Sequence, residues 1–386
     1  MEKAKRCYSC KNLLDLENKS EEHIIPNSIG GKIKSYWLLC RNCNSRFANT
    51  IDSDFAKSYE DIVALLNLKR DRPKEYIVKN LKSSDGESYH LINGRSPTPI
   101  KPTINIDRKD NKIQITARDR AHLDEIISGL KRKFPNLDDS KFEEKLSGQN
   151  TYLESPLTLK MKFGGEGYLL ALAKMALNFY LYQGGNQIFL KEIVDVLNKK
   201  IKIDDHIHFS YIDQEVVWQE EEVSHQIFIK GNKEERLLYA YIILFSSNAF
   251  IVNLSNDYQG EDIEMGTCYD VLRNINLEKI IKFNYQGRHN FKLEVQKNGV
   301  QLNRLYISSI QNNLKRVMNI SNIIQTKESM KELNKTCLDE ILKKHGDQKI
   351  FTKAMLDEYI NLLSAKTAAF YVQMENQNAK LKNRSL

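Results

Sequence analysis

Three short motifs near the amino terminus decide how the chain is interpreted: Cys7-Tyr8-Ser9-Cys10, Glu22-His23-Ile24-Ile25-Pro26 and Cys40-Arg41-Asn42-Cys43-Asn44. Each Cys-x-x-Cys pair places two thiolates at a spacing that suits zinc, and two such pairs complete a four-sulfur site with no open position. The alternative is that the cysteines are small buried hydrophobic residues. Basic residues flank both pairs and indicate an exposed setting instead. We therefore expect Cys7, Cys10, Cys40 and Cys43 to bind a structural zinc ion.

The acidic–histidine pair between the two cysteine motifs has a different chemistry. The Glu22 carboxylate is a hard oxygen ligand that suits Mg²⁺ or Mn²⁺. A neutral His23 beside it can take a proton from water near pH 7, and Asn44 can add a carbonyl oxygen. Hydrolysis of a phosphodiester requires such a set of groups. An isolated Glu-His pair is more often a surface feature, so the interpretation depends on all three motifs together.

The first 58 residues predict a small module of strand, loop, strand and helix. We expect a hairpin between residues 22–25 and 36–39, and a helix from Asn42 to about Lys57. Such a module is too small to be stable through a hydrophobic core alone, so a structural metal ion is expected to stabilise it. Neighbouring residues on a regular strand point to opposite faces. Glu22 and His23 can therefore serve one phosphate only where the strand twists, bulges or ends.

The order and spacing of these motifs, with Gly30-Gly31 and Leu38-Leu39 between them, resemble the HNH endonuclease family over about residues 5–57. The resemblance implies a ββα-metal fold in which His23 is the general base. It also implies that Glu22 and Asn44 bind one catalytic Mg²⁺ or Mn²⁺ and that the cysteines bind zinc. DNA hydrolysis, leaving 5′-phosphate and 3′-hydroxyl ends, is the expected reaction.

The chain departs from that family at two positions. Many members have histidine where this chain has Asn44, a neutral and weaker ligand. Members also commonly carry an asparagine that braces the loop under the base, about five residues before the third cysteine. This chain has Ser35 there, a shorter hydrogen-bonding side chain.

Composition restricts the partners and the compartment. A net charge of +8 permits a polyanionic partner without requiring one. No apolar run is long enough to predict a transmembrane helix, so no membrane partner is expected. The basic start is followed by a cysteine motif rather than an apolar signal core, and paired Cys-x-x-Cys motifs suit a reducing compartment. We expect a cytoplasmic protein whose partner is double-stranded DNA.

The remaining chain predicts an α+β protein: the zinc-bound module, then a mixed region with an antiparallel sheet and a helical carboxyl terminus. The predicted segments are residues 1–58 for the nuclease module, 59–150 for a linker or recognition domain, 151–300 for a helix pair with the sheet, and 301–386 for the helices. Predicted strands cover residues 103–107, 112–117, 206–218, 224–230, 236–245, 249–254, 279–285 and 291–295. We expect the four runs between residues 206 and 254 to form an antiparallel meander, in which each strand pairs with the next. Predicted helices cover residues 59–68, 119–133, 168–183, 189–197, 308–333, 336–345 and 351–378.

The region beyond residue 58 looks like the part often attached to this HNH subtype in bacterial proteins. That resemblance suggests an effector of antiphage defence whose carboxyl-terminal region senses a signal or builds an oligomer, as a homo-oligomer or with a partner protein. Two alternatives stay open. One is a non-catalytic zinc module that only binds nucleic acid. The other is a nuclease that is silent until a nucleotide ligand or a partner protein binds.

Overall fold

The structure is a computed structural model that describes residues 5–68, 77–83, 86–92, 98–99, 103–107, 112–117, 120–134, 157–158, 161–203, 206–212, 215–283, 287–346 and 350–384. The chain forms two compact units. The first combines Met1–Tyr76 with Met161–Asn322, and the second combines Ile77–Lys160 with Ile323–Leu386. The predicted α+β class, with antiparallel sheets and a helical carboxyl terminus, is confirmed. The predicted segment boundaries stay an interpretation of the sequence.

The amino-terminal module begins with a short antiparallel pair, β1 (Glu22–His23) and β2 (Lys34–Ser35). The predicted hairpin arm at 36–39 was wrong. The Leu38 and Leu39 carbonyls instead accept hydrogen bonds from the amides of Tyr8 and Ser20. Backbone groups that bond to the cysteine loop cannot also extend the hairpin, so the pair stays two residues long.

The predicted helix after the third cysteine is confirmed, and it is continuous with the helix predicted over residues 59–68. It comprises α1 (Arg41–Phe47), a π-helical turn η2 (Ala48–Asp52) and α2 (Ser53–Leu65). No proline or glycine interrupts this stretch, so the helix continues. A π turn changes which residues face inward, and such turns are frequent at functional sites.

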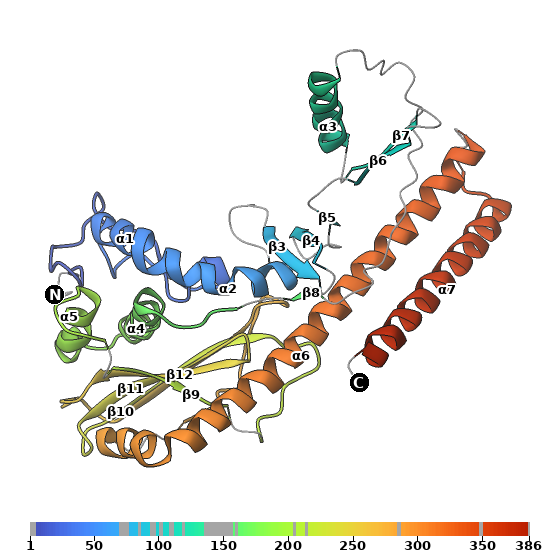
Figure 1. The fold of residues 1–386 in the computed structure, drawn as a ribbon. Helices are drawn as coiled ribbons and strands as arrows, with labels where there is room; N and C mark the ends of the chain where they lie inside the picture. The colour runs from blue at the N-terminus through green and yellow to red at the C-terminus, as the bar shows by residue number, and fades with distance from the viewer. Residues whose placement is uncertain are drawn as a thin grey trace. The chain divides into compact units, whose positions relative to one another are not determined.

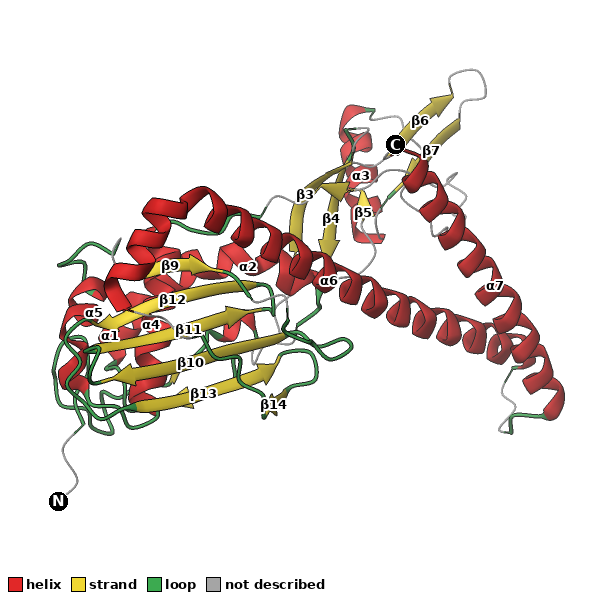
Figure 2. Ribbon diagram, turned by 90° about the horizontal axis from the view of Figure 1, so that it is seen from below, coloured by secondary structure: helices red, strands yellow, loops and turns green. Residues whose placement is uncertain are grey.

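The first unit is built on a six-stranded antiparallel sheet. Its strands follow the order β14-β13-β10-β11-β12-β9 (Figure 2). Their bounds are β9 (Ile207–Ser210), β10 (Ser224–Asn232), β11 (Leu237–Leu244), β12 (Asn248–Ser255), β13 (Ile263–Asp270) and β14 (Ile275–Leu277). The predicted meander is confirmed for β10, β11 and β12. The expectation for β9 was wrong, because β9 pairs with β12 and not with β10.

Two further strand predictions were also wrong. Residues 279–283 form no strand, and residues 291–295 lie inside the long helix α6 (Gly287–His345). Residues 284–286 lie outside the described residues. The strand β13 was missed because Glu264, Gly266 and Thr267 interrupt its apolar pattern. The backbone of β13 nevertheless pairs with β10 along the whole strand, because backbone hydrogen bonds form whichever side chains the strand carries.

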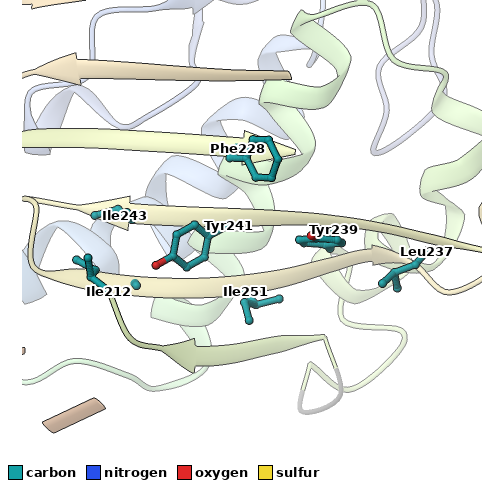
Figure 3. Close-up of a cluster of buried hydrophobic side chains, with 8 residues drawn as sticks. Ile212, Phe228, Leu237, Tyr239, Tyr241, Ile243 and Ile251 are labelled. Carbon is teal, nitrogen blue, oxygen red and sulfur yellow. The ribbon is translucent and has the colours of Figure 1, made fainter. Parts of the chain in front are cut away.

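Both faces of the sheet are covered, and all eight residues of β11 are buried. One face lies under the helices α1, α2, α4 (Glu166–Tyr182) and α5 (Lys191–Leu197), as Figure 1 shows. The other face carries a cluster of buried side chains drawn in Figure 3: Ile212, Phe228, Leu237, Tyr239, Tyr241, Ile243 and Ile251, with Ala249. Trp218, Ile280 and Phe283 are among the residues that pack over this cluster. Burial on both sides explains the continuous apolar runs.

The helix α4 lies between the sheet and α2, and nearly all of it is buried. Its sequence is apolar around its whole circumference, as expected for a helix enclosed on all sides. Lys174 and Asn178 are the polar side chains buried in its middle. The prediction for residues 168–183 is confirmed, and a 3₁₀ turn (Gln187–Leu190) precedes α5 where the second helix was expected.

The second unit contains a four-stranded sheet, a separate hairpin and helices. The sheet has the order β5-β4-β3-β8, from β3 (Ile77–Ser83), β4 (Ser88–Ile92), β5 (Thr98–Pro99) and β8 (Leu157–Thr158). The predicted hairpin is confirmed as β6 (Thr103–Asp107) and β7 (Lys112–Thr116), as is the helix α3 (Arg120–Lys133).

The helical carboxyl terminus has fewer helices than predicted. The structure has α6 and α7 (Lys353–Arg384), without the break expected between residues 333 and 336. No glycine or proline lies there, and the first break follows at Gly346, which has a positive φ. No helix within the described ranges has the length and apolar character of a membrane span.

Candidate active site

The four cysteines of the paired motifs lie together. Their sulfur atoms are all within 4.8 Å of one another. The Cys10 and Cys40 sulfurs are 3.7 Å apart. Tetrahedral zinc with Zn–S bonds near 2.3 Å requires a sulfur–sulfur separation of about 3.8 Å. The geometry and the all-sulfur donor set therefore fit a structural zinc ion, as the sequence predicts.

This cluster sets the start of α1. Cys40 is the amino-terminal cap residue of that helix, and its carbonyl accepts the hydrogen bond of the Asn44 amide. The Asn44 side chain then reaches the strand side of the module, where its Nδ2 donates to the Glu21 carbonyl at 2.8 Å. A side chain on the first turn of the helix is thus tied to the residue that precedes Glu22 and His23.

His23 is half-buried on β1, and its neighbour Asn27 was not found by sequence reasoning. Asn27 Nδ2 lies 3.4 Å from His23 Nε2. Ser35, at the position where the family commonly has a bracing asparagine, pairs across the ladder with Glu22, and its hydroxyl accepts from the Trp37 amide. Asn27 lies four residues after the histidine and directly after Pro26. That position in a predicted loop did not indicate a contact with the histidine ring.

The backbone between β1 and β2 requires glycine at positions 30 and 31. Gly30 has a φ of 94°, which favours glycine. At Gly31, an added Cβ would lie 1.9 Å from the Ile25 carbonyl oxygen. The chain can therefore turn back from the Ile24-Ile25-Pro26 segment toward β2 only with a glycine at this position.

Glu22 faces the interior and is 4% exposed. Its Oε1 lies 2.6 Å from Lys174 Nζ and accepts a hydrogen bond from Asn178 Nδ2 at 3.0 Å. Burial raises the pKa of the Glu22 carboxyl, and the charge of Lys174 opposes that shift. Both contacts use Oε1, and none of the residues that the structure describes hydrogen-bonds Oε2.

Lys174 links Glu22 to a second carboxylate. Its Nζ also lies 2.6 Å from Asp52 Oδ2, at the end of the π turn. Burial lowers the pKa of Lys174, but Asp52 and Glu22 together raise it above its ordinary value, so the ammonium stays charged. One ammonium between two carboxylates leaves a surplus negative charge. Asp52 Oδ1 and Asn178 Oδ1 are buried acceptors without a hydrogen-bond partner in the described part of the chain.

Sequence reasoning did not assign Asp52, Lys174 or Asn178 to the site. A signal was available for the last two, because they are polar residues four apart in an otherwise apolar helix. Residues with that spacing lie on one face of a helix. Which distant carboxylate they would meet depends on tertiary packing, which a single sequence does not specify.

The exposed rim of the module combines charged and aromatic side chains. Glu21 pairs with Lys34 at 2.9 Å and accepts from the Tyr36 hydroxyl at 2.5 Å, and these two partners lower the pKa of its carboxyl. Lys5 and Lys19 both lie over the half-exposed Trp37 ring, at 5.1 and 4.6 Å from its centroid. A ring flanked by ammonium groups offers contacts to phosphates and bases alike.

A buried histidine fastens the module to the sheet. His225 Nδ1 accepts from the Phe245 amide at 3.0 Å, so the ring hydrogen is on Nε2, which donates to the Ile29 carbonyl at 2.8 Å. Complete burial lowers the pKa of His225 to about 4. The ring is therefore neutral at physiological pH, and both nitrogens are used in bridging β10 to the loop after β1.

Comparison with known proteins supports one assignment. Residues 7–60 match the HNH endonuclease family, a stretch that includes the four cysteines, Glu22, His23 and Asn44. No curated protein and no solved structure matches this chain. The family match ends within α2, so α4 and the six-stranded sheet lie outside it.

Proposed function

We propose that this protein is a metal-dependent endonuclease that hydrolyses phosphodiester bonds of DNA, with His23 as the general base. The observation that supports it most is the hydrogen bond from the Asn44 side chain to the Glu21 carbonyl. It joins the first turn of α1 to the strand that carries Glu22 and His23. A strand pair and a helix held together beside a four-thiolate cluster make up the ββα-metal arrangement.

Within this proposal, Glu22 and Asn44 hold one divalent ion. The Asn44 amide nitrogen is used on Glu21, which leaves its carbonyl oxygen as a donor. Glu22 uses Oε1 for Lys174 and Asn178, which leaves Oε2. Two oxygen donors, one charged and one neutral, suit Mg²⁺ or Mn²⁺. When bound, the ion would stabilise negative charge on the phosphate and on the leaving oxygen.

His23 then has the task of taking a proton from the attacking water at a ring nitrogen. A general base contributes typically 10²–10⁴-fold to such a rate. Asn27 limits rotation of the ring through its contact with Nε2. The lysines around Trp37 would bind the phosphate backbone next to the cut.

Plasmid cleavage tests the proposal. Purified protein with one zinc per chain is incubated with supercoiled plasmid in Mg²⁺ and, separately, in EDTA, beside the His23→Ala variant at equal zinc content. The proposal expects nicking or linearisation by the wild type in Mg²⁺ alone. A module that only binds nucleic acid would shift the plasmid in a gel with no cleavage by either protein.

The cellular role stays a prediction of the sequence: an antiphage effector, as a homo-oligomer or with a partner protein. A nuclease that awaits a nucleotide ligand or partner would leave plasmid intact until that component is added. Cleavage by the purified protein alone would remove the reason for this hypothesis. Replacing plasmid by an RNA of the same sequence distinguishes the two nucleic acids.

A further inference from the structure

The helix α4 contributes two buried polar side chains to the nuclease module, although it lies outside the residues that match the HNH family. Lys174 and Asn178 are 3% and 0% exposed and both contact Glu22 Oε1. They are four residues apart, on one face of the helix. The rest of the buried helix is overwhelmingly apolar, so these two side chains are exceptions that point to one atom.

Packing alone does not account for these contacts. A buried ion pair is often no more stabilising than a well-packed apolar pair of the same volume, because desolvating both charges is costly. Here two donors converge on a single oxygen of the carboxylate and leave the other oxygen without a described partner. Groups that hydrogen-bond one oxygen of a ligating carboxylate orient it toward the metal, and their loss typically weakens binding 10- to 100-fold.

Lys174 also spans the two elements that carry the proposed ligands. It contacts Glu22 on β1 and Asp52 on the π turn, which directly continues α1, the helix of Asn44. One ammonium group therefore sets the separation between the strand and the helix from the inner side. The zinc cluster sets it from the other end of α1.

We infer that Lys174 and Asn178 are positioning residues of the nuclease site. The helix α4 therefore supplies contacts to Glu22 that residues 7–60 do not provide. The two residues act through Glu22 by fixing its Oε1, and the inference depends on the proposed role of Glu22 as an ion ligand. The amino-terminal module without α4 is accordingly expected to bind zinc but to bind the catalytic ion poorly.

The test measures Mn²⁺ binding by the zinc-loaded full-length protein in the absence of DNA, from the loss of the free Mn²⁺ electron paramagnetic resonance signal. The informative variant is Asn178→Leu, which removes one donor at similar volume. Its matched control is Tyr168→Phe on the same helix, which removes the buried hydrogen bond to Tyr59 at 2.8 Å and leaves Glu22 untouched. Lys174→Met is the stronger variant, and zinc content and circular dichroism establish whether it folds.

The inference expects Asn178→Leu to weaken Mn²⁺ binding at least tenfold and Tyr168→Phe to change it less than twofold, with similar small losses in melting temperature. If both variants bind Mn²⁺ as the wild type does, the positioning role is wrong while the proposed nuclease stands. If the wild type itself neither binds Mn²⁺ nor cleaves DNA, the proposed function fails and the inference falls with it. Should Lys174→Met not fold, Asn178→Leu alone decides.

Discussion

The amino-terminal module and the six-stranded sheet belong to one compact unit, yet they are stabilised differently. In the sheet, β11 is apolar and buried along its whole length, and aromatic and aliphatic side chains cover both faces. In the module, the strands β1 and β2 have two residues each, and a thiol cluster and a buried ion pair add directional contacts to a small apolar core that includes Ile24, Ile29 and Phe47. Apolar burial is non-directional, whereas thiolate and hydrogen-bond geometry is directional.

The difference suggests a division of labour. The sheet supplies a rigid support through hydrophobic burial, and the module fixes the direction of individual side chains. Its links to the support include two specific polar contacts, His225 with the Ile29 carbonyl and Lys174 with Glu22, beside the aromatic contact of Phe55 with Tyr168. The two regions should therefore respond differently to metal removal, core truncation and pH.

Zinc removal should have the largest effect and should be confined to the module. Structural zinc contributes about 10–16 kcal/mol in small zinc domains, so Cys43→Ser or a strong chelator should unfold the region around the cysteines. Limited proteolysis should then cut within the first 50 residues or so, while the sheet stays folded by circular dichroism. A protease-resistant amino terminus at zero zinc content would contradict this account.

Truncating the sheet core should lower global stability without affecting zinc. Phe228 is 1% exposed within the cluster of Figure 3. Phe228→Ala should reduce the free energy of unfolding by about 3–5 kcal/mol in urea titrations. Ile275→Ala, at a 46%-exposed edge position, is the control and should change stability little. Loss of zinc from the Phe228 variant would show that the two regions are not separately stabilised.

Acid should weaken the link between the regions through His225. Its pKa is about 4 in the folded chain and near 6.5 when unfolded, so the unfolded state binds more protons in this interval. The contribution to stability is complete above pH 6.5 and is lost as pH falls toward 4, by an amount on the order of 3 kcal/mol. His225→Gln should flatten the pH dependence of the unfolding free energy. Equal slopes for both proteins would contradict the assignment.

The smallest expected effect concerns the orientation of His23. Removing one hydrogen bond costs about 0.5–1.5 kcal/mol, so Asn27→Ala should slow cleavage by roughly twofold to tenfold at unchanged zinc content. Ser35→Ala is the matched control, since the Ser35 hydroxyl bonds to the Trp37 amide. If Ser35→Ala slowed cleavage more than Asn27→Ala, Ser35 rather than Asn27 would be the residue that orients His23.

Local signals predicted much of this fold. Four cysteines at metal spacing, the helix beginning near Asn42 and the meander β10-β11-β12 each follow from residues close together in the chain. The position of β9 did not follow, because strand order is set by tertiary packing. Residues 291–295 were predicted as a strand because apolar and charged residues alternate there, and five residues are too few to distinguish that alternation from part of a helix. Lys174 and Asn178 looked like part of a core helix, since their partner Glu22 lies about 150 residues away.

Chemical rescue tests the central claim most directly: His23 is the group that activates water. The measurement is the single-turnover rate of Mg²⁺-dependent plasmid cleavage by His23→Ala, with and without added imidazole, at matched zinc content. The account predicts a rate at least 10²-fold below wild type that rises with imidazole concentration. Cleavage by His23→Ala at the wild-type rate, unaffected by imidazole, would contradict it.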